Sequence, residues 1–116
     1  MKAKAICLKQ PWASMVATGE KTIETRVWKT NYRGDFLVVA SANPKIGNLP
    51  TGQAIAIATL VDCRPMTRKD EKAACIKLYP NAWAWPLENI RTIKPFKVKG
   101  TLGFFNVNHR VIVSKN

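Results

Sequence analysis

The residues best suited to chemistry lie in one short stretch, residues 19–28, with the sequence GEKTIETRVW. Its alternating polar and apolar residues predict a β-strand from Thr22 to Trp28. On such a strand Glu24 and Arg26 are two positions apart, so their side chains emerge on one face about 7 Å apart. They can pair, or present a carboxylate acceptor and a planar five-donor guanidinium to a ligand. The competing interpretation is a solvated strand with an exposed ion pair, worth about 0–1 kcal/mol.

A lysine at the preceding turn adds a third charged group. Lys21 can act as a base or nucleophile only when it is partly neutral, which requires burial or neighbouring cations. Arg26 favours the neutral amine, whereas Glu24 favours the charged ammonium. The three residues therefore suit either ligand binding or catalysis, and the sequence leaves both open.

The whole chain is strongly basic. Its 116 residues include 19 Lys and Arg against 7 Asp and Glu, a formal net charge of +12. Such a charge is typical of nucleic-acid-binding domains, although it can also serve solubility alone. Further basic residues that can follow a phosphate backbone are Arg64, Arg68, Lys69, Lys72, Lys94, Lys97 and Lys99. For Lys69 and Lys72 we favour a solvated helix face.

Composition argues against several other classes of protein. The three cysteines, Cys7, Cys63 and Cys75, have no C-x-x-C spacing, and His109 is the only histidine. A zinc site usually needs four closely organised ligands, so we expect no metal and no cofactor. No apolar run reaches the ~20 residues of a membrane span, and the basic N-terminus lacks the apolar stretch of a signal peptide. We therefore expect a cytoplasmic protein that makes no membrane contact.

The hydrophobic pattern predicts a mostly β protein of the α+β class, with two short helices, in a single domain over residues 1–116. The predicted strands cover residues 4–8, 22–28, 35–41, 53–63, 83–87, 90–98, 101–108 and 111–114. The predicted helices cover residues 11–19 and 67 to about 78. Regularly spaced strands in a basic domain suggest a small, partly closed β-barrel.

Local signals set the helix ends. Pro11 suits the first helical position, and Gly19 suits the left-handed position that follows a helix. Thr67 and Asp70 form a start for the second helix that is similar to a capping box. Because Trp12 falls on the apolar stripe of the first helix, we expect it in the core.

Several motifs, in order along the chain, resemble those of one known family. The central one is G-x-K-x-x-E-x-R at residues 19–26, preceded by Q-P-W-A at 10–13. It is followed by W-x-T-x-Y-R-G at 28–34, W-x-L-E-N at 85–89 and K-G-x-x-G-F at 99–104. In these motifs, over almost its whole length, the chain resembles the ASCH domain family, named for activating signal cointegrator 1 homology.

The resemblance implies a fold and a class of function. The fold is a small PUA-like β-barrel, shared with RNA-modification domains, with a cleft lined by residues 19–26. The implied function is binding of RNA or another single-stranded nucleic acid, or of a modified nucleoside, by a monomer. Fold alone does not choose among these ligands. A module that recruits an acidic protein partner is a further interpretation of the charge.

Aromatic and charged residues near the central motif complete the predicted ligand site. The predicted ligand-binding residues are Lys21, Glu24, Arg26, Trp28, Tyr32, Arg33 and Trp85. Glu24 can accept a hydrogen bond from a base amino group. Trp28, Tyr32 or Trp85 can stack on that base, worth about 1–3 kcal/mol. For Trp28 and Trp85 the alternative is packing in the core or at a sheet edge.

An enzyme is the alternative to a binding module. A small branch similar to ASCH domains consists of amidohydrolases that remove the acetyl group from N4-acetylcytidine. There the resemblance implies Lys21 as the catalytic lysine and Asp62 as a carboxylate from another strand, while Glu24 stands where that branch has a threonine. If the chain is an enzyme, we expect Lys21, Glu24 and Asp62 to be catalytic. A metal-free ribonuclease is a second enzymatic possibility.

Overall fold

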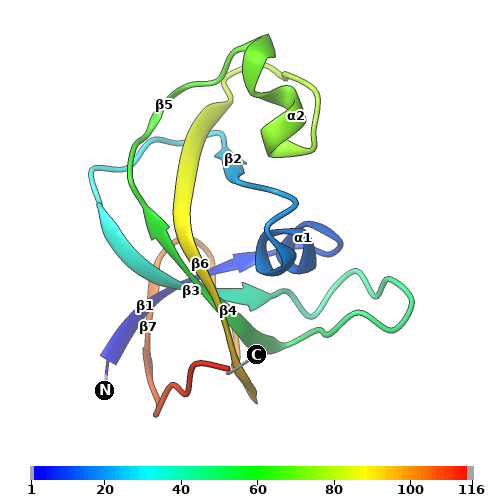
Figure 1. Ribbon diagram of the computed structural model, residues 1–116, viewed down its shortest axis with the longest axis vertical. Coiled ribbons are helices and arrows are strands. Elements are labelled where there is room, and N and C mark those ends of the chain that lie inside the picture. Colours follow the sequence, from blue (N-terminus) through cyan, green and yellow to red (C-terminus); the bar gives the residue numbers. More distant parts are fainter. Residues whose placement is uncertain (1, 115–116) are drawn as a thin grey trace.

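A computed structural model describes residues 2–114 (Figure 1). The elements in chain order are β1 (Lys2–Leu8), α1 (Trp12–Thr18), β2 (Ile23–Arg26), β3 (Gly34–Ala40), β4 (Gln53–Leu60), β5 (Arg64–Pro65), the 3₁₀-helix η1 (Arg68–Asp70), α2 (Glu71–Ala74), β6 (Trp83–Lys97) and β7 (Phe105–Asn108). The class predicted from the sequence, mostly β with two short helices, is confirmed. Both helices lie on the same side of the curved sheet in Figure 1, next to β2.

The strands form one mixed, strongly curved sheet. The pairing order is β2-β6-β4-β3-β1-β7, with β5 added on β6. The β1–β3 pair is parallel and the other pairs are antiparallel. The segment after β7 returns to β6 through an isolated bridge between Ile93 and Val113, so β6 contacts both β4 and the chain that follows β7. The main hydrophobic core is formed by residues of β1, β3, β4 and β6 together with α1.

The long strand β6 replaces two predicted strands. The sequence pattern predicts two separate strands, residues 83–87 and 90–98. In the structure, Ile57 pairs with Arg91 and Thr59 with Glu88, so β6 has one more residue than β4 in this interval. Asn89 adopts φ 50°, a conformation that Asn tolerates. A bulge therefore accommodates the extra residue, and the strand continues through the predicted gap.

Other predicted boundaries also differ from the observed ones. The predicted strand 101–108 contains only β7, and residues 101–104 form a loop. The predicted strand 111–114 is reduced to the bridge at Val113. The predicted strands 22–28 and 53–63 end earlier, at Arg26 and Leu60. In each case the hydrophobic pattern extends beyond the residues that have a partner strand.

The core combines the small residues of β4 with large aromatic residues, Trp85 and Phe36. Ala54, Ala56 and Ala58 are all 0% exposed. Ala56 and Ala58 belong to the same apolar cluster as Trp85, which is also fully buried. The small alanine side chains along β4 thus leave room for large neighbours in the core.

A glycine turn after α1 carries the chain into the central motif. Gly19 has φ 85° and ends α1 in the left-handed conformation, as predicted. Its N–H donates to the Val16 carbonyl, and the Lys21 N–H donates to the Met15 carbonyl at 3.0 Å. These two hydrogen bonds therefore fix the backbone of Lys21 next to the last turn of α1.

The second helix is shorter than predicted. α2 ends at Ala74, and Cys75 adopts the left-handed conformation at φ 56°. The Ala73 carbonyl accepts the N–H of Thr22 at 2.9 Å, and the Ala74 carbonyl accepts a hydrogen bond from the Lys21 ammonium. Because these carbonyls bond to the chain before β2, they are not available to extend the helix to residue 78.

The predicted capping box at the start of this helical segment is confirmed. The Asp70 carboxylate accepts the Thr67 N–H at 2.8 Å and is only 5% exposed. Arg64 donates two hydrogen bonds to the same carboxylate, both at 2.8 Å. These hydrogen bonds hold the pKa of Asp70 well below its usual value, at about 2.

We expect Asp70→Asn to destabilise the protein by about 2–3 kcal/mol at neutral pH, because a buried arginine-bound carboxylate is lost. A carboxyl group whose pKa falls from about 3.9 in the unfolded chain to about 2 in the folded one stabilises the fold above about pH 4. That stabilisation is lost as the pH falls toward 2. Urea unfolding at several acidic pH values measures both effects. Asp62→Asn, at an exposed aspartate, is the control and is expected to change little.

Candidate functional site

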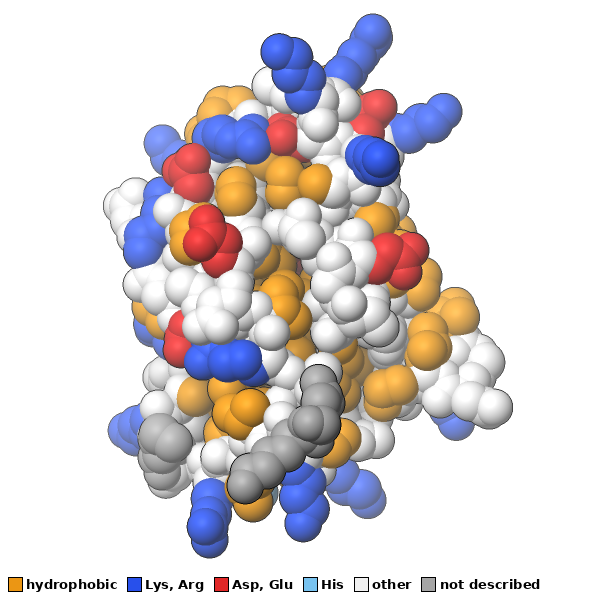
Figure 2. Space-filling view, in the orientation of Figure 1, with side chains coloured by type: hydrophobic (Ala, Val, Ile, Leu, Met, Phe, Trp, Pro, Cys, Tyr) orange, Lys and Arg blue, Asp and Glu red, His pale blue; other side chains and the backbone are white. Residues whose placement is uncertain are grey.

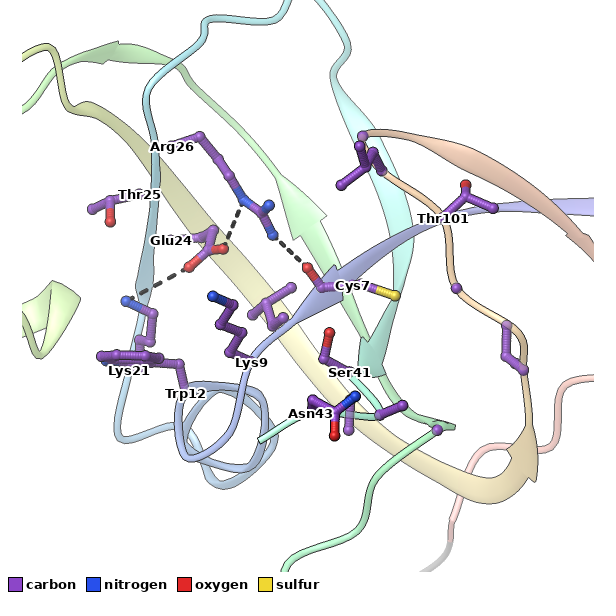
Figure 3. A pocket seen from close by; sticks show the side chains of 18 of the residues that line it. Cys7, Lys9, Trp12, Lys21, Glu24, Thr25, Arg26, Ser41, Asn43 and Thr101 are labelled. Atoms are coloured by element: carbon purple, nitrogen blue, oxygen red, sulfur yellow. Dashed lines mark hydrogen bonds and ion pairs between the residues drawn. The ribbon is translucent and has the colours of Figure 1, made fainter. Parts of the chain in front are cut away.

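A cavity of about 770 Å³ lies where the end of β1, the start of α1, β2 and the end of β3 meet the loop after β6 (Figure 3). Its charged lining residues are Lys9, Lys21, Glu24, Arg26 and Lys99. Its aromatic lining residues are Trp12 and Tyr79. The central motif from the sequence, Lys21, Glu24 and Arg26, therefore lines one cavity.

Lys21 is the most deeply buried charged residue of the cavity. Its residue surface is 1% exposed, and its ammonium donates to the Ala74 carbonyl. The Nζ atom lies 3.7 Å from Oε1 of Glu24. Burial lowers the pKa of Lys21, and the charge of Glu24 opposes this shift without cancelling it. The interpretation of this stretch as a solvated strand is therefore wrong.

Glu24 lies between two cations. Its Oε2 accepts a hydrogen bond from Nε of Arg26 at 3.0 Å, while Oε1 faces Lys21. A second guanidinium nitrogen of Arg26 donates to the Cys7 carbonyl at 2.6 Å. Figure 3 shows these three interactions side by side. Each charged group is thus held in one orientation before any ligand arrives.

The aromatic lining of the cavity differs from the prediction. Trp12, expected in the core, is half-buried, and its indole N–H donates to the Cys75 carbonyl at 3.4 Å. The core face of α1 is instead formed by Ala13 and Val16, both 0% exposed. Tyr79 donates to the Thr25 hydroxyl at 2.9 Å. The sequence does contain a signal for the position of Trp12 at the cavity, which is its place in the Q-P-W-A motif.

The structure does not bring the other predicted aromatic residues to the cavity. Trp85 is 0% exposed, and its ring stacks on Phe104 at 5.8 Å. Trp28 packs edge-on against Trp85 at 4.8 Å. A nucleobase cannot reach the ring of Trp85, so its predicted stacking role is wrong and core packing is the correct interpretation. Neither tryptophan lines the cavity.

Three further predicted residues lie together outside the cavity. Arg33 and Asp62 are exposed and form a long ion pair of 3.9 Å. Tyr32 donates to the Asp35 carbonyl, and its ring contacts Lys4 at 5.4 Å and Phe104 at 5.2 Å. The predicted grouping of Tyr32, Arg33 and Asp62 with Lys21 is therefore not observed. Tyr32 and Arg33 lie close to the central motif in sequence and the resemblance implies Asp62, but none of the three lines the cavity.

A close backbone contact joins two walls of the cavity. A Cβ atom added at Gly100 would lie 2.0 Å from Sγ of Cys7. Only a glycine lets the loop after β6 pack this tightly on β1. Burial raises the pKa of the Cys7 thiol, with Arg26 opposing the shift.

We expect Gly100→Ala to destabilise the protein by about 1–3 kcal/mol, because the new methyl group overlaps Cys7 Sγ. The double variant Gly100→Ala/Cys7→Ala is expected to recover most of this loss, since the nearest remaining Cys7 atom, Cβ, lies at 3.7 Å. Thermal unfolding of both variants and of Cys7→Ala alone measures the coupling. Equal losses in the single and double variants would show that the contact does not matter.

Residues 2–114 contain neither a cluster of metal ligands nor a membrane-spanning helix. No group of three or more His, Cys, Asp or Glu residues in this range could hold a metal ion. No helix in this range is both long and apolar enough to cross a membrane.

Comparisons with known proteins agree with the resemblance in the sequence. The ASCH domain model matches residues 6–97. The crystal structure of ASCH from Zymomonas mobilis is 17% identical, with a TM-score of 0.64, over 82% of this chain and 73% of that chain. Two mutants of that protein, one tyrosine-to-phenylalanine and one serine-to-alanine, are also 17% identical, with TM-scores of 0.61 and 0.60. The match to the tyrosine mutant covers 82% of this chain and 75% of that chain. The match to the serine mutant covers 81% of this chain and 72% of that chain.

These comparisons differ in what they show. At 17% identity, the likeness to the solved structures shows the fold alone. A search of curated proteins gave no match. The domain match spans most of the sequence, including the whole central motif. The chain therefore belongs to the ASCH domain family.

Proposed function

We propose that this protein binds single-stranded nucleic acid, RNA in particular, and holds one base in the cavity. The observation that carries the proposal is the combination of accessible aromatic rings, Trp12 and Tyr79, with a fixed acceptor and donor pair, Glu24 and Arg26, in a single cavity. Its volume of about 770 Å³ is within the usual range for small-ligand sites. A nucleobase has both a stacking face and a hydrogen-bonding edge, so it fits these two kinds of group.

The charge of the protein supports a polyanionic partner. The formal net charge is +12, and Figure 2 shows Lys and Arg side chains around much of the outline of one face, with apolar side chains exposed between them. Acidic side chains are also visible on this face, but the whole sequence has only 7 Asp and Glu against 19 Lys and Arg. Basic surfaces of this kind attract phosphate backbones at long range. We propose RNA rather than DNA as the ligand, because the PUA-like fold that the resemblance implies is shared with RNA-modification domains.

Fluorescence polarisation with a short labelled single-stranded RNA tests the proposal. We expect binding at about 50 mM salt, with log K falling linearly against log salt by about 0.7 for each phosphate contacted. A DNA of the same sequence separates RNA preference from general polyanion binding. No binding at low salt, or an affinity that does not depend on salt, would end the proposal.

The aromatic contact has its own prediction. We expect Trp12→Leu to weaken RNA binding by about 10-fold or more, because a stacked base contributes about 1–3 kcal/mol. Trp83→Leu is the matched control, since Trp83 is also half-buried but lies outside the cavity, next to Lys29. Polarisation titrations of both variants measure the effect. Equal losses in the two variants would contradict a base held against Trp12.

A second candidate function, amide hydrolysis on an acylated nucleoside, is favoured by one observation. Burial lowers the pKa of Lys21, which increases the fraction of neutral amine available as a base or nucleophile. Asp62, the second carboxylate expected for this reaction, is exposed and paired with Arg33, so Glu24 is the carboxylate that supports the candidate. Incubation with N4-acetylcytidine, followed by chromatography of the products, tests it. Deacetylation that Lys21→Met abolishes would favour the enzyme over the binding module.

A further inference from the structure

Two lysines at the cavity have no role in the interactions described so far. Lys9 follows β1, and Lys99 lies in the loop after β6. Both line the cavity and both are exposed. Neither forms an ion pair or a hydrogen bond through its side chain with any described residue. Their charges are therefore available to a ligand.

Unlike these two lysines, the inner charged groups of the cavity, Lys21, Glu24 and Arg26, interact with one another. Glu24 is bonded to Arg26 and faces Lys21, so its charge offsets one of their two positive charges. Glu24 is also the only carboxylate among the described residues that line the cavity. The cavity thus has a formal excess of three positive charges, of which two belong to Lys9 and Lys99. A neutral nucleoside would leave this excess without a partner.

The two lysines lie within two positions of one close contact in the lining of the cavity. Cys7, two residues before Lys9, is in close contact with Gly100, the residue after Lys99. The Lys9 carbonyl accepts the Ala13 N–H at 3.1 Å, which fixes this position to the start of α1. Figure 3 shows the Lys9 side chain among the groups that line the cavity, with Thr101 of the opposite loop on the far side of Cys7. The contact therefore joins the two distant segments that carry Lys9 and Lys99, and both lysines line the same cavity.

We propose that Lys9 and Lys99 bind the phosphate group of a nucleotide whose base occupies the cavity, so that the ligand is a nucleoside phosphate rather than a nucleoside. This inference rests on the proposed function and narrows its ligand class. A phosphate monoester carries a charge of about −1.5 to −2 near neutral pH, which two lysines match. Lysine suits this role because its ammonium contacts phosphate as a point charge and does not need a fixed planar geometry. In a bound RNA strand, the same two lysines would contact the phosphate next to the inserted base.

Calorimetric titration of the whole protein tests the inference with defined probes. The probes are adenosine, cytidine, guanosine and uridine, each compared with its 3′- and 5′-monophosphate, and inorganic phosphate alone, all at about 50 mM salt. We expect at least one monophosphate to bind about 10-fold or more tightly than its nucleoside, since a hydrogen bond to a charged group contributes about 1.5–3 kcal/mol. Inorganic phosphate is expected to bind more weakly than that monophosphate, because it lacks the stacked base. Equal or tighter binding of inorganic phosphate would identify a free phosphate site instead and overturn the inference.

Two double variants assign the effect to the cavity. Lys9→Gln/Lys99→Gln is expected to bind the monophosphate and its nucleoside with the same affinity. Lys69→Gln/Lys72→Gln removes the same charge from exposed positions outside the cavity and is expected to keep the difference. The inference fails if wild-type protein binds nucleoside and monophosphate equally, if both double variants lose the difference alike, or if RNA binds while no mononucleotide does. In each of these outcomes, binding of RNA would still support the proposed function, which fails only if RNA itself does not bind.

Discussion

Lys21→Met is expected to destabilise the protein by about 3 kcal/mol, the largest loss that we expect from any single substitution in the cavity. Methionine fills a similar volume, but it leaves the Ala74 carbonyl without its donor and the buried Glu24 with one cation fewer. Breaking a buried charge pair from one side is costly because the remaining charge is left uncompensated. Arg26 still contacts Glu24, which keeps the loss at the lower end of the usual range. Urea unfolding measures the change.

A double variant and an exposed lysine serve as controls. Lys21→Met/Glu24→Gln removes both charges, so we expect it to recover part of the stability lost in the single variant. Lys72→Met, at an exposed position of α2, is expected to change stability little. If Lys21→Met is as harmless as Lys72→Met, the interaction between Lys21, Ala74 and Glu24 does not hold β2 against α2.

The lowered pKa of Lys21 also predicts how stability depends on pH. Between this lowered pKa and the value of about 10.4 in the unfolded chain, the unfolded state binds more protons than the folded state. The contribution of Lys21 to stability therefore rises with pH across this interval. We expect Lys21→Met to abolish that rise, while Lys72→Met retains it. Unfolding measured at several alkaline pH values distinguishes the two.

The second large effect is expected at Arg26. Arg26→Lys keeps the positive charge but loses the planar group that bonds to Glu24 and to the Cys7 carbonyl together. We expect RNA binding to weaken about 10- to 100-fold, because hydrogen bonds to charged groups contribute about 1.5–3 kcal/mol and Glu24 loses its fixed orientation. Arg26→Ala is less informative, since it also reduces the charge around the buried Glu24. Arg68→Lys, at an exposed arginine outside the cavity, is the matched control.

Base preference separates two roles for Glu24. If Glu24 accepts from a base amino group, Glu24→Gln weakens binding most for RNA rich in bases that carry an amino group, such as cytosine. Parallel polarisation titrations with cytosine-rich and uracil-rich RNA measure this difference. We expect the preference to relax in Glu24→Gln. Uniformly stronger binding to both RNAs would instead mean that Glu24 only neutralises nearby cations.

Much of the framework could be predicted from the sequence because its signals are local. The left-handed turn at Gly19, the capping box between Thr67 and Asp70 and the alternation along β2 each depend on residues within a few positions of one another. The central motif was recognised because its residue types recur at fixed spacing in the ASCH domain family. The three charged residues of that motif do line one cavity, as the alternation and the resemblance to that family imply.

The tryptophans show where local reasoning failed. Trp12 lies on an apolar stripe yet lines the cavity, whereas Trp85, a predicted stacking residue, is fully buried. Trp85 is covered because Trp28 and Phe104, from distant segments, pack against it. Whether an aromatic residue is in the core or faces a ligand depends on what covers it, and a hydrophobic pattern does not contain that information.

By itself, the sequence determined the fold class, the positive charge and the identity of the central charged residues, because periodicity, composition and motif spacing are properties of the chain before it folds. The tertiary structure alone decided that Lys21 is buried against Ala74, 53 positions away, and that Cys7 packs on Gly100. It also decided that Asp62 and Arg33 lie outside the cavity and that Lys9 and Lys99 lie at it. The physical reason is that desolvation, pKa and ligand access depend on atoms within a few ångströms, most of which come from segments far away in the sequence.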